Sequence, residues 1–251
     1  MDGLHWSSDT FKNQAYNLRR GRVDLLRQHV AYKSAAILQV VRHAPEPPEL
    51  VLIGDNAESD PVIYLGIKLF LEGHLGREGY RKYLEIAGVE PDLAEAVIAK
   101  YAYSLKGSVS RIFIRSLGGK KIARVSPLTS SIHEFASFSE VAFVECLEGG
   151  LHPGWVWQLV RTFHNRHGAE LPDLLVRLYA LRDSERLPQE ARGELQAVID
   201  RLEGVQANCE VPAKKVDPFA GYLSPEPIKV AEDELLHAAA GWIEAQTPKE
   251  E

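Results

Sequence analysis

The residues best suited to chemistry lie in one short segment, Leu50 to Tyr64, which reads LVLIGDNAESDPVIY. Gly54 and Asp55 directly follow the apolar run at its start, and Asp60 stands on the same short loop. Two carboxylates placed in this way can coordinate a hard divalent cation, because Mg²⁺ takes one or two carboxylates together with water and phosphate oxygens. The segment therefore predicts a Mg²⁺ site at the end of a strand.

A positive charge is expected near the same place. Lys33 lies near the start of a helix predicted from Tyr32 to Val41, and a lysine there could reach the strand end and neutralise a phosphate. Gly54 allows a tight turn, and we interpret Asn56 and Glu58 as supports of the loop. Two plainer readings stay open: Asp60 alone is typical of a helix N-cap, and Lys33 alone is typical of a solvated surface side chain.

The elements that must position these residues follow from the hydrophobic pattern. The apolar run Leu50–Ile53, bounded by proline and glycine, is typical of a buried parallel strand. The helix after Asp60 is apolar nearly all round, which predicts that it is buried. Strand, helix, strand and helix in this order indicate a parallel sheet covered by helices. The other expected elements are helices at about 77–87, 91–104 and 135–147 and a strand at 110–115.

Beyond Pro153 only helical patterns are found. They cover about 154–167, 171–182, 188–203 and 231–246, and a stretch with four prolines at 208–227 is predicted to be a loop. The sequence thus predicts an α/β part at residues 1–152 and an all-helical C-terminal region at 153–251.

The order of these features resembles a known family. A lysine at a helix start, an apolar strand and then VLIGDNAESDPVIY resemble the third and fourth motifs of the haloacid dehalogenase (HAD) superfamily. More narrowly, they resemble the catalytic domain of the actin-patch-type phosphatidate phosphatases, whose strand reads like FVLIGDSGExDPExY. The segments SRIFIRSL and FASFSEVAFVECLEGGL resemble the next strand and helix of that family. The resemblance covers roughly residues 19–151.

The resemblance implies a partial HAD-like, Rossmann-type fold and an activity. Asp55 would hold Mg²⁺, and Asp60 would assist it or orient Asp55. Lys33 would stabilise the charge on the phosphoryl group. The chain would then be a Mg²⁺-dependent phosphatase acting on a phosphorylated small molecule or a phospholipid.

One part of the family's machinery is not found. HAD phosphatases attack phosphorus with the first aspartate of a DxDxT/V motif, and this sequence contains no DxD triplet. Three explanations stay open: the chain is a fragment or starts late, it has lost catalysis, or a partner chain supplies the missing half. The alternative function is a non-catalytic binding or scaffold protein on a degenerate HAD fold.

The composition of the chain indicates which classes of partner and which cellular location to expect. The net charge of −6 and the pI near 5.9 argue against nucleic acid. Two cysteines without metal-ligand spacing, together with a polar N-terminus, predict a cytoplasmic protein with reduced thiols. No apolar stretch approaches the roughly 20 residues of a membrane span. Peripheral contact with a membrane stays open.

Overall fold

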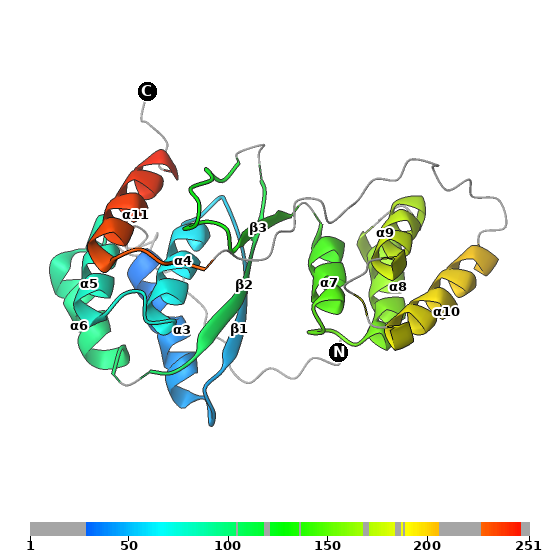
Figure 1. Ribbon diagram of the computed structural model, residues 1–251, viewed down its shortest axis with the longest axis horizontal. Helices are drawn as coiled ribbons and strands as arrows, with labels where there is room; N and C mark the ends of the chain where they lie inside the picture. The colour runs from blue at the N-terminus through cyan, green and yellow to red at the C-terminus, as the bar shows by residue number, and fades with distance from the viewer. Residues whose placement is uncertain are drawn as a thin grey trace, which may run out of the picture. The chain divides into compact units, whose positions relative to one another are not determined.

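The computed structural model describes residues 29–103, 105–117, 121–135, 137–167, 171–183, 187, 189–205 and 227–246. The predicted proline-rich loop at 208–227 lies outside these residues apart from Pro227. Figure 1 shows the elements in chain order: α3 (His29–His43), β1 (Glu49–Asp55), α4 (Asp60–Leu71), α5 (Arg77–Ile86), α6 (Pro91–Tyr101), β2 (Ser108–Arg115), β3 (Ile132–Phe135), α7 (Phe138–Leu147), the short 3-10 helix η1 (Pro153–Trp155), α8 (Val156–His167), α9 (Leu171–Asp183), α10 (Gln189–Val205) and α11 (Glu232–Gln246).

The chain folds into two compact units. The first contains residues 1–134 and 224–251, and the second contains residues 135–223. The first unit is of the α/β class and holds the sheet, and the second is built mainly of helices α7 to α10.

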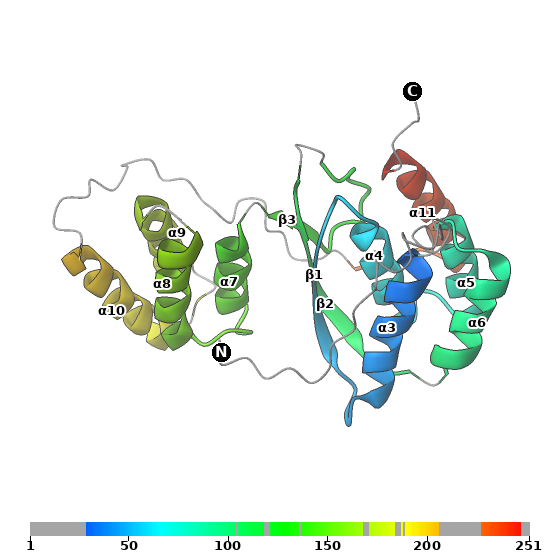
Figure 2. The same cartoon turned by 180° about the vertical axis from the view of Figure 1, so that it is seen from behind.

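The sheet of the described residues has three strands in the order β1-β2-β3. β1 and β2 are parallel, with Glu49 opposite Ser108 and Asp55 opposite Arg115. The connection between them contains α4, α5 and α6, as parallel strands require a long crossover. In both views, helices α3, α4, α5, α6 and α11 lie on one side of β1 and β2 (Figures 1 and 2).

Helix α4 is the centre of the first unit's core. Every residue from Asp60 to Leu69 is buried, in agreement with a sequence that is apolar nearly all round. Helix α5 packs on it through Tyr83, whose hydroxyl donates to the carbonyl oxygen of Val62 at 2.7 Å. Asp60, the first residue of α4, is therefore anchored in a helix that is packed in the core.

Three features of the chain were not expected from the sequence. Helix α11 belongs to the first unit, although residues 153–251 were predicted to form one helical region. Trp242 explains this, because its side chain is buried in the first unit's core and its Nε1 donates to the carbonyl of Ala123 at 2.9 Å. β3 was also missed, and α7 begins at Phe138, three residues later than predicted.

The second unit has a core of its own. Leucines of α9 and α10, including Leu174, Leu178 and Leu195, pack with Val156 and Val160 of α8. In neither unit do the described residues include a helix with the length and apolarity needed to cross a membrane.

Candidate functional site

Gly54 and Asp55 stand at the carboxyl end of β1, where the chain turns towards α4. The absence of a side chain at Gly54 is required by its neighbour, because an ideal Cβ there would lie 2.3 Å from Oδ2 of Asp60. Ligands of open parallel sheets collect at the carboxyl ends of the strands. The predicted turn residue thus lets the start of α4 approach this end of β1.

Asp60 links three parts of the site. Only 4% of it is exposed, and it is the first residue of α4, with Ser59 at the N-cap position and no side-chain capping hydrogen bond. Its Oδ1 accepts from the Lys33 ammonium at 2.5 Å, and its Oδ2 accepts from the backbone N–H of Asp55 at 3.3 Å. The N-cap reading of Asp60 is therefore wrong, because both carboxylate oxygens hold groups outside α4.

Lys33 is held by two carboxylates. Its Nζ lies 2.5 Å from Oδ1 of Asp60 and 2.8 Å from Oε2 of Glu58. Burial on its own lowers the pKa of Lys33, but the hydrogen bonds to Asp60 and Glu58 outweigh it and raise the pKa above its usual value. Lys33 is therefore a fixed cation at neutral pH, and the reading of a freely solvated lysine does not hold.

Glu58 brings a residue into the site that the sequence analysis did not name. The Oε2 atom of Glu58 lies 3.2 Å from Nε2 of His29 as well as 2.8 Å from Nζ of Lys33. His29 and Lys33 are four residues apart in α3, so they lie on the same face of the helix. This spacing was the signal that could have found His29.

Asn56 ties the loop to the end of β2. Its backbone N–H donates to the carbonyl of Arg115 at 3.1 Å, and its Oδ1 accepts from the N–H of Leu117 at 2.7 Å. Asp55 Oδ1 accepts from the N–H of Ala57 at 2.9 Å, which closes a short turn. These bonds fix the direction in which the Asp55 carboxylate leaves β1.

Tyr64 completes the site from α4. Its hydroxyl donates to the carbonyl of Ile53 at 3.1 Å. Burial raises the pKa of Tyr64 strongly, and the charges of Asp60, Asp55 and Glu58 raise it further. Tyr64 is therefore a neutral hydrogen-bond donor that binds the backbone near the carboxyl end of β1.

The donor set can be tested against a divalent cation. The described residues contain no group of three or more His, Cys, Asp or Glu side chains placed to hold a metal ion. Asp55 has one carboxylate oxygen, Oδ2, without a hydrogen-bond partner among the described residues, whereas both oxygens of Asp60 are engaged. Such a set fits Mg²⁺ only as a site completed by water and phosphate oxygens.

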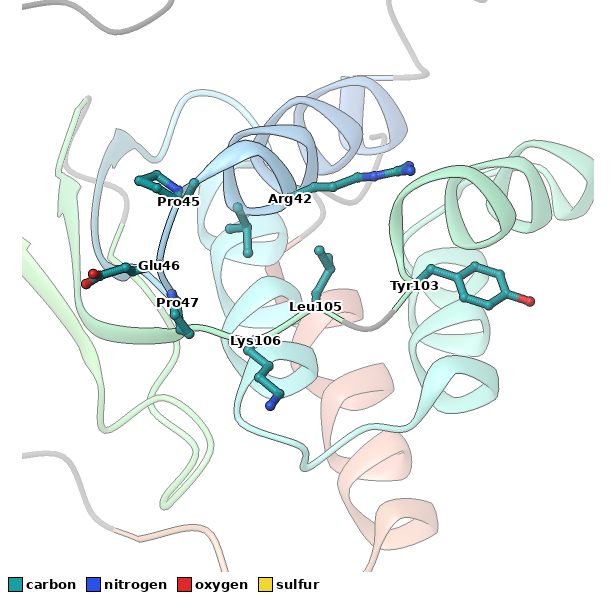
Figure 3. A pocket seen from close by; sticks show the side chains of 9 residues that line it. Arg42, Pro45, Glu46, Pro47, Tyr103, Leu105 and Lys106 are labelled. Carbon is teal, nitrogen blue, oxygen red and sulfur yellow. The ribbon is translucent and has the colours of Figure 1, made fainter.

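Two cavities of the first unit lie away from this site. One, of about 260 Å³, is lined by Val41, Arg42, Ala44, Pro45, Glu46, Pro47, Tyr103, Leu105 and Lys106. Figure 3 shows that the Lys106 side chain points down in the view, whereas those of Arg42 and Tyr103 extend to the right, and Arg42 donates to the carbonyl of Lys100 at 2.6 Å. This cavity therefore lacks the convergent polar groups of a ligand site.

The second cavity, also of about 260 Å³, is lined in part by the buried Lys68 and the half-buried Glu72. The Lys68 ammonium donates to Glu72 Oε1 at 2.6 Å and to the carbonyl of Val109 at 2.8 Å. Glu72 Oε1 also accepts from the N–H of Val109 at 3.3 Å. The pair thus satisfies the backbone of β2 beside its irregular register, which is a structural role.

A scan against models of protein families, a search of curated proteins and a search of solved structures each found no match for this chain.

Proposed function

We propose that this chain carries the metal-binding and phosphate-binding part of a Mg²⁺-dependent phosphoryl-transfer site of the HAD type. One observation carries the proposal: the Lys33 ammonium, the Asp60 carboxylate and the backbone of Asp55 form one connected set at the carboxyl end of β1. The substrate class is a phosphate monoester, and a lipid phosphate is the member that the resemblance favours.

The hydrogen bonds of the site suggest a separate role for each of three residues. Asp55 would hold Mg²⁺ through the oxygen that has no partner among the described residues, and Asp60 would position both Asp55 and Lys33. Lys33 would stabilise negative charge on the phosphoryl oxygens. When bound, Mg²⁺ would supply further charge stabilisation on those oxygens.

The attacking carboxylate is the part that the described site does not supply. The sequence contains no DxD triplet, and the buried carboxylate of Asp60 is engaged with Lys33 and with the N–H of Asp55. We therefore propose that the chain by itself binds Mg²⁺ and a phosphate monoester without turnover. A partner chain that supplies a carboxylate beside β1 would complete the site.

A second candidate function is that of a non-catalytic binding protein. Val51 and Ile53 of β1 are 36% and 44% exposed, although they are large apolar side chains of an edge strand. Exposed edge strands of this kind are templates for pairing with another chain. The Ile53 carbonyl accepts from Tyr64 and the Asp55 N–H donates to Asp60, so these backbone groups near the end of β1 are already engaged.

The experiment that tests the proposal measures Mg²⁺ binding by calorimetry in the presence of a non-hydrolysable phosphonate. The Asp55→Asn variant should lose Mg²⁺ binding, whereas Asp92→Asn, which changes an exposed aspartate of α6, should bind Mg²⁺ normally. Asp60→Asn should lower the affinity less than Asp55→Asn, because Asp60 acts through its neighbours. Equal Mg²⁺ binding by the native chain and Asp55→Asn would exclude the proposed site and favour the binding protein.

Turnover is measured separately by phosphate release from 4-nitrophenyl phosphate and from phosphatidate in vesicles. The chain alone is expected to release no phosphate. Release that depends on Mg²⁺ and disappears in Asp55→Asn would show that an attacking group is present after all.

A further inference from the structure

The carboxylate of Glu58 lies against two nitrogen groups of α3. A single oxygen, Oε2, is 2.8 Å from Nζ of Lys33 and 3.2 Å from Nε2 of His29. Both groups can donate a hydrogen bond to an oxygen, Lys33 as an ammonium and His29 through its ring N–H. Two donors that converge on one oxygen from one helix face make a small oxyanion site.

The three residues differ in how firmly the fold holds them. His29 and Lys33 are part of α3, and their side chains are 13% and 28% exposed. Glu58 stands on the loop between β1 and α4, and its side chain is 39% exposed, the most of the three. The donors are therefore fixed and the carboxylate is the member that can swing into solvent.

Asp60 occupies a different position in the same cluster. It is buried in the first turn of α4 and also holds the backbone of Asp55, so it cannot leave Lys33 without disturbing β1. The ion pairs of Glu58 with Lys33 and His29 are partly exposed to solvent, and such pairs are weak because water screens the charges. A phosphate group carries up to two charges and three acceptor oxygens, so it can replace Glu58 at both donors.

We propose that His29 and Lys33 form a phosphate-binding site, and that Glu58 occupies it in the ligand-free protein as an internal substitute for the phosphate. Binding of a phosphate group displaces the Glu58 carboxylate into solvent. This inference deepens the proposed function, because it names a second donor and a competing group at the same site.

The test titrates the full chain with inorganic phosphate, without Mg²⁺ and at constant ionic strength, and follows binding by calorimetry. Glu58→Ala removes the competitor, so it should bind phosphate about fivefold more tightly, which corresponds to about 1 kcal/mol for the lost exposed pairs. Glu49→Ala is the control, since it removes one exposed acidic side chain of β1 and changes the net charge equally. It should leave the phosphate affinity within a factor of about two.

His29→Gln tests the second donor. It should weaken phosphate binding in the Glu58→Ala background, where no carboxylate competes, and urea unfolding checks that each variant is folded. Phosphate affinity that is unchanged or lower in Glu58→Ala would overturn the proposed substitution, and so would an equal gain in Glu49→Ala. An unchanged affinity on His29→Gln would remove His29 from the site.

These outcomes are separate from those of the proposed function. Tighter phosphate binding by Glu58→Ala without any Mg²⁺ binding at Asp55 would support this inference and refute the phosphoryl-transfer site. Mg²⁺ binding that depends on Asp55, with phosphate affinity indifferent to Glu58, would give the opposite result.

Discussion

The substitution Gly54→Ala adds one methyl group at the carboxyl end of β1, where its nearest neighbours are atoms of Asp60. An ideal Cβ at this position lies 2.3 Å from Oδ2, 2.7 Å from Cβ and 2.8 Å from Cγ of Asp60. Favourable contacts between non-bonded heavy atoms lie near 3.5 to 4.0 Å, so Asp60 must move by about 1 Å. Rotation of its side chain does not relieve the contact with its Cβ, which moves only with the backbone of α4.

The expected cost has two parts. Overpacking of a filled site costs about 1 to 3 kcal/mol. Moving Asp60 also weakens its hydrogen bonds to Lys33 and to the Asp55 N–H, and bonds to charged groups contribute about 1.5 to 3 kcal/mol each. Since the bonds are strained rather than lost, we expect Gly54→Ala to lower the free energy of unfolding by about 3 kcal/mol in total.

Urea unfolding followed by tryptophan fluorescence measures this change. Gly241→Ala is the matched control, because a Cβ at Gly241 in α11 meets nothing within 4 Å. It should raise stability by about 0.5 to 1 kcal/mol through helix propensity. The reasoning would be refuted if Gly54→Ala unfolded within about 0.5 kcal/mol of the native chain, or if Asp60→Ala showed no energetic coupling to it in a double-mutant cycle.

Four further outcomes follow from the same contacts. Because the pKa of Lys33 is raised in the folded chain, its stabilising effect is complete below the unfolded value of 10.5 and is lost as pH rises through the folded pKa. Lys33→Met should therefore be less stable than the native chain at pH 8, and the two urea midpoints should converge above pH 10.5; a constant gap would contradict the ion pairs. Asp60→Asn should reduce the same gap, because among the described residues Lys33 then keeps only Glu58 as a charged partner. Burial raises the pKa of Cys146 to about 11, so in a Cys209→Ser background a thiol reagent should label it slowly at pH 8, and rapid labelling would contradict that burial. Trp242→Phe removes the bond to the Ala123 carbonyl and should lower stability by about 1 to 3 kcal/mol, seen as an earlier urea midpoint.

The sequence was most informative where one physical requirement decided the structure. The nearly all-apolar α4 is buried from Asp60 to Leu69 as predicted, and both α4 and β1 lie within a few residues of their predicted bounds. The prediction that β1 is a buried strand was wrong, because Val51 and Ile53 are 36% and 44% exposed. The division of the chain could not be predicted in this manner. Helix α11 follows a long segment, and tertiary contacts assign it to the first unit, among them the burial of Leu235, Ala239 and Trp242 in that unit's core.

β3 shows a different limit. Ile132–Phe135 is a strand of four residues, too short for its alternation to stand out from the polar stretch before it. Its side chains are mostly buried by neighbours that are distant in sequence, as when His133 packs on the ring of Phe113. Such contacts join residues that are distant in sequence, so the pattern of four consecutive residues cannot predict them.

The different roles of Asp55 and Asp60 illustrate what spacing alone leaves open. Both are carboxylates of one loop, and the motif permits either to hold a cation. Their surroundings separate them: the buried Asp60 needs a positive partner and obtains it from Lys33, because an unpaired buried charge is costly. Asp55 is less buried, and within the described part of the chain its carboxylate bonds only through Oδ1, so its other oxygen is the better candidate to face a cation. The role of each carboxylate therefore depends on α3, a helix that the loop motif does not contain.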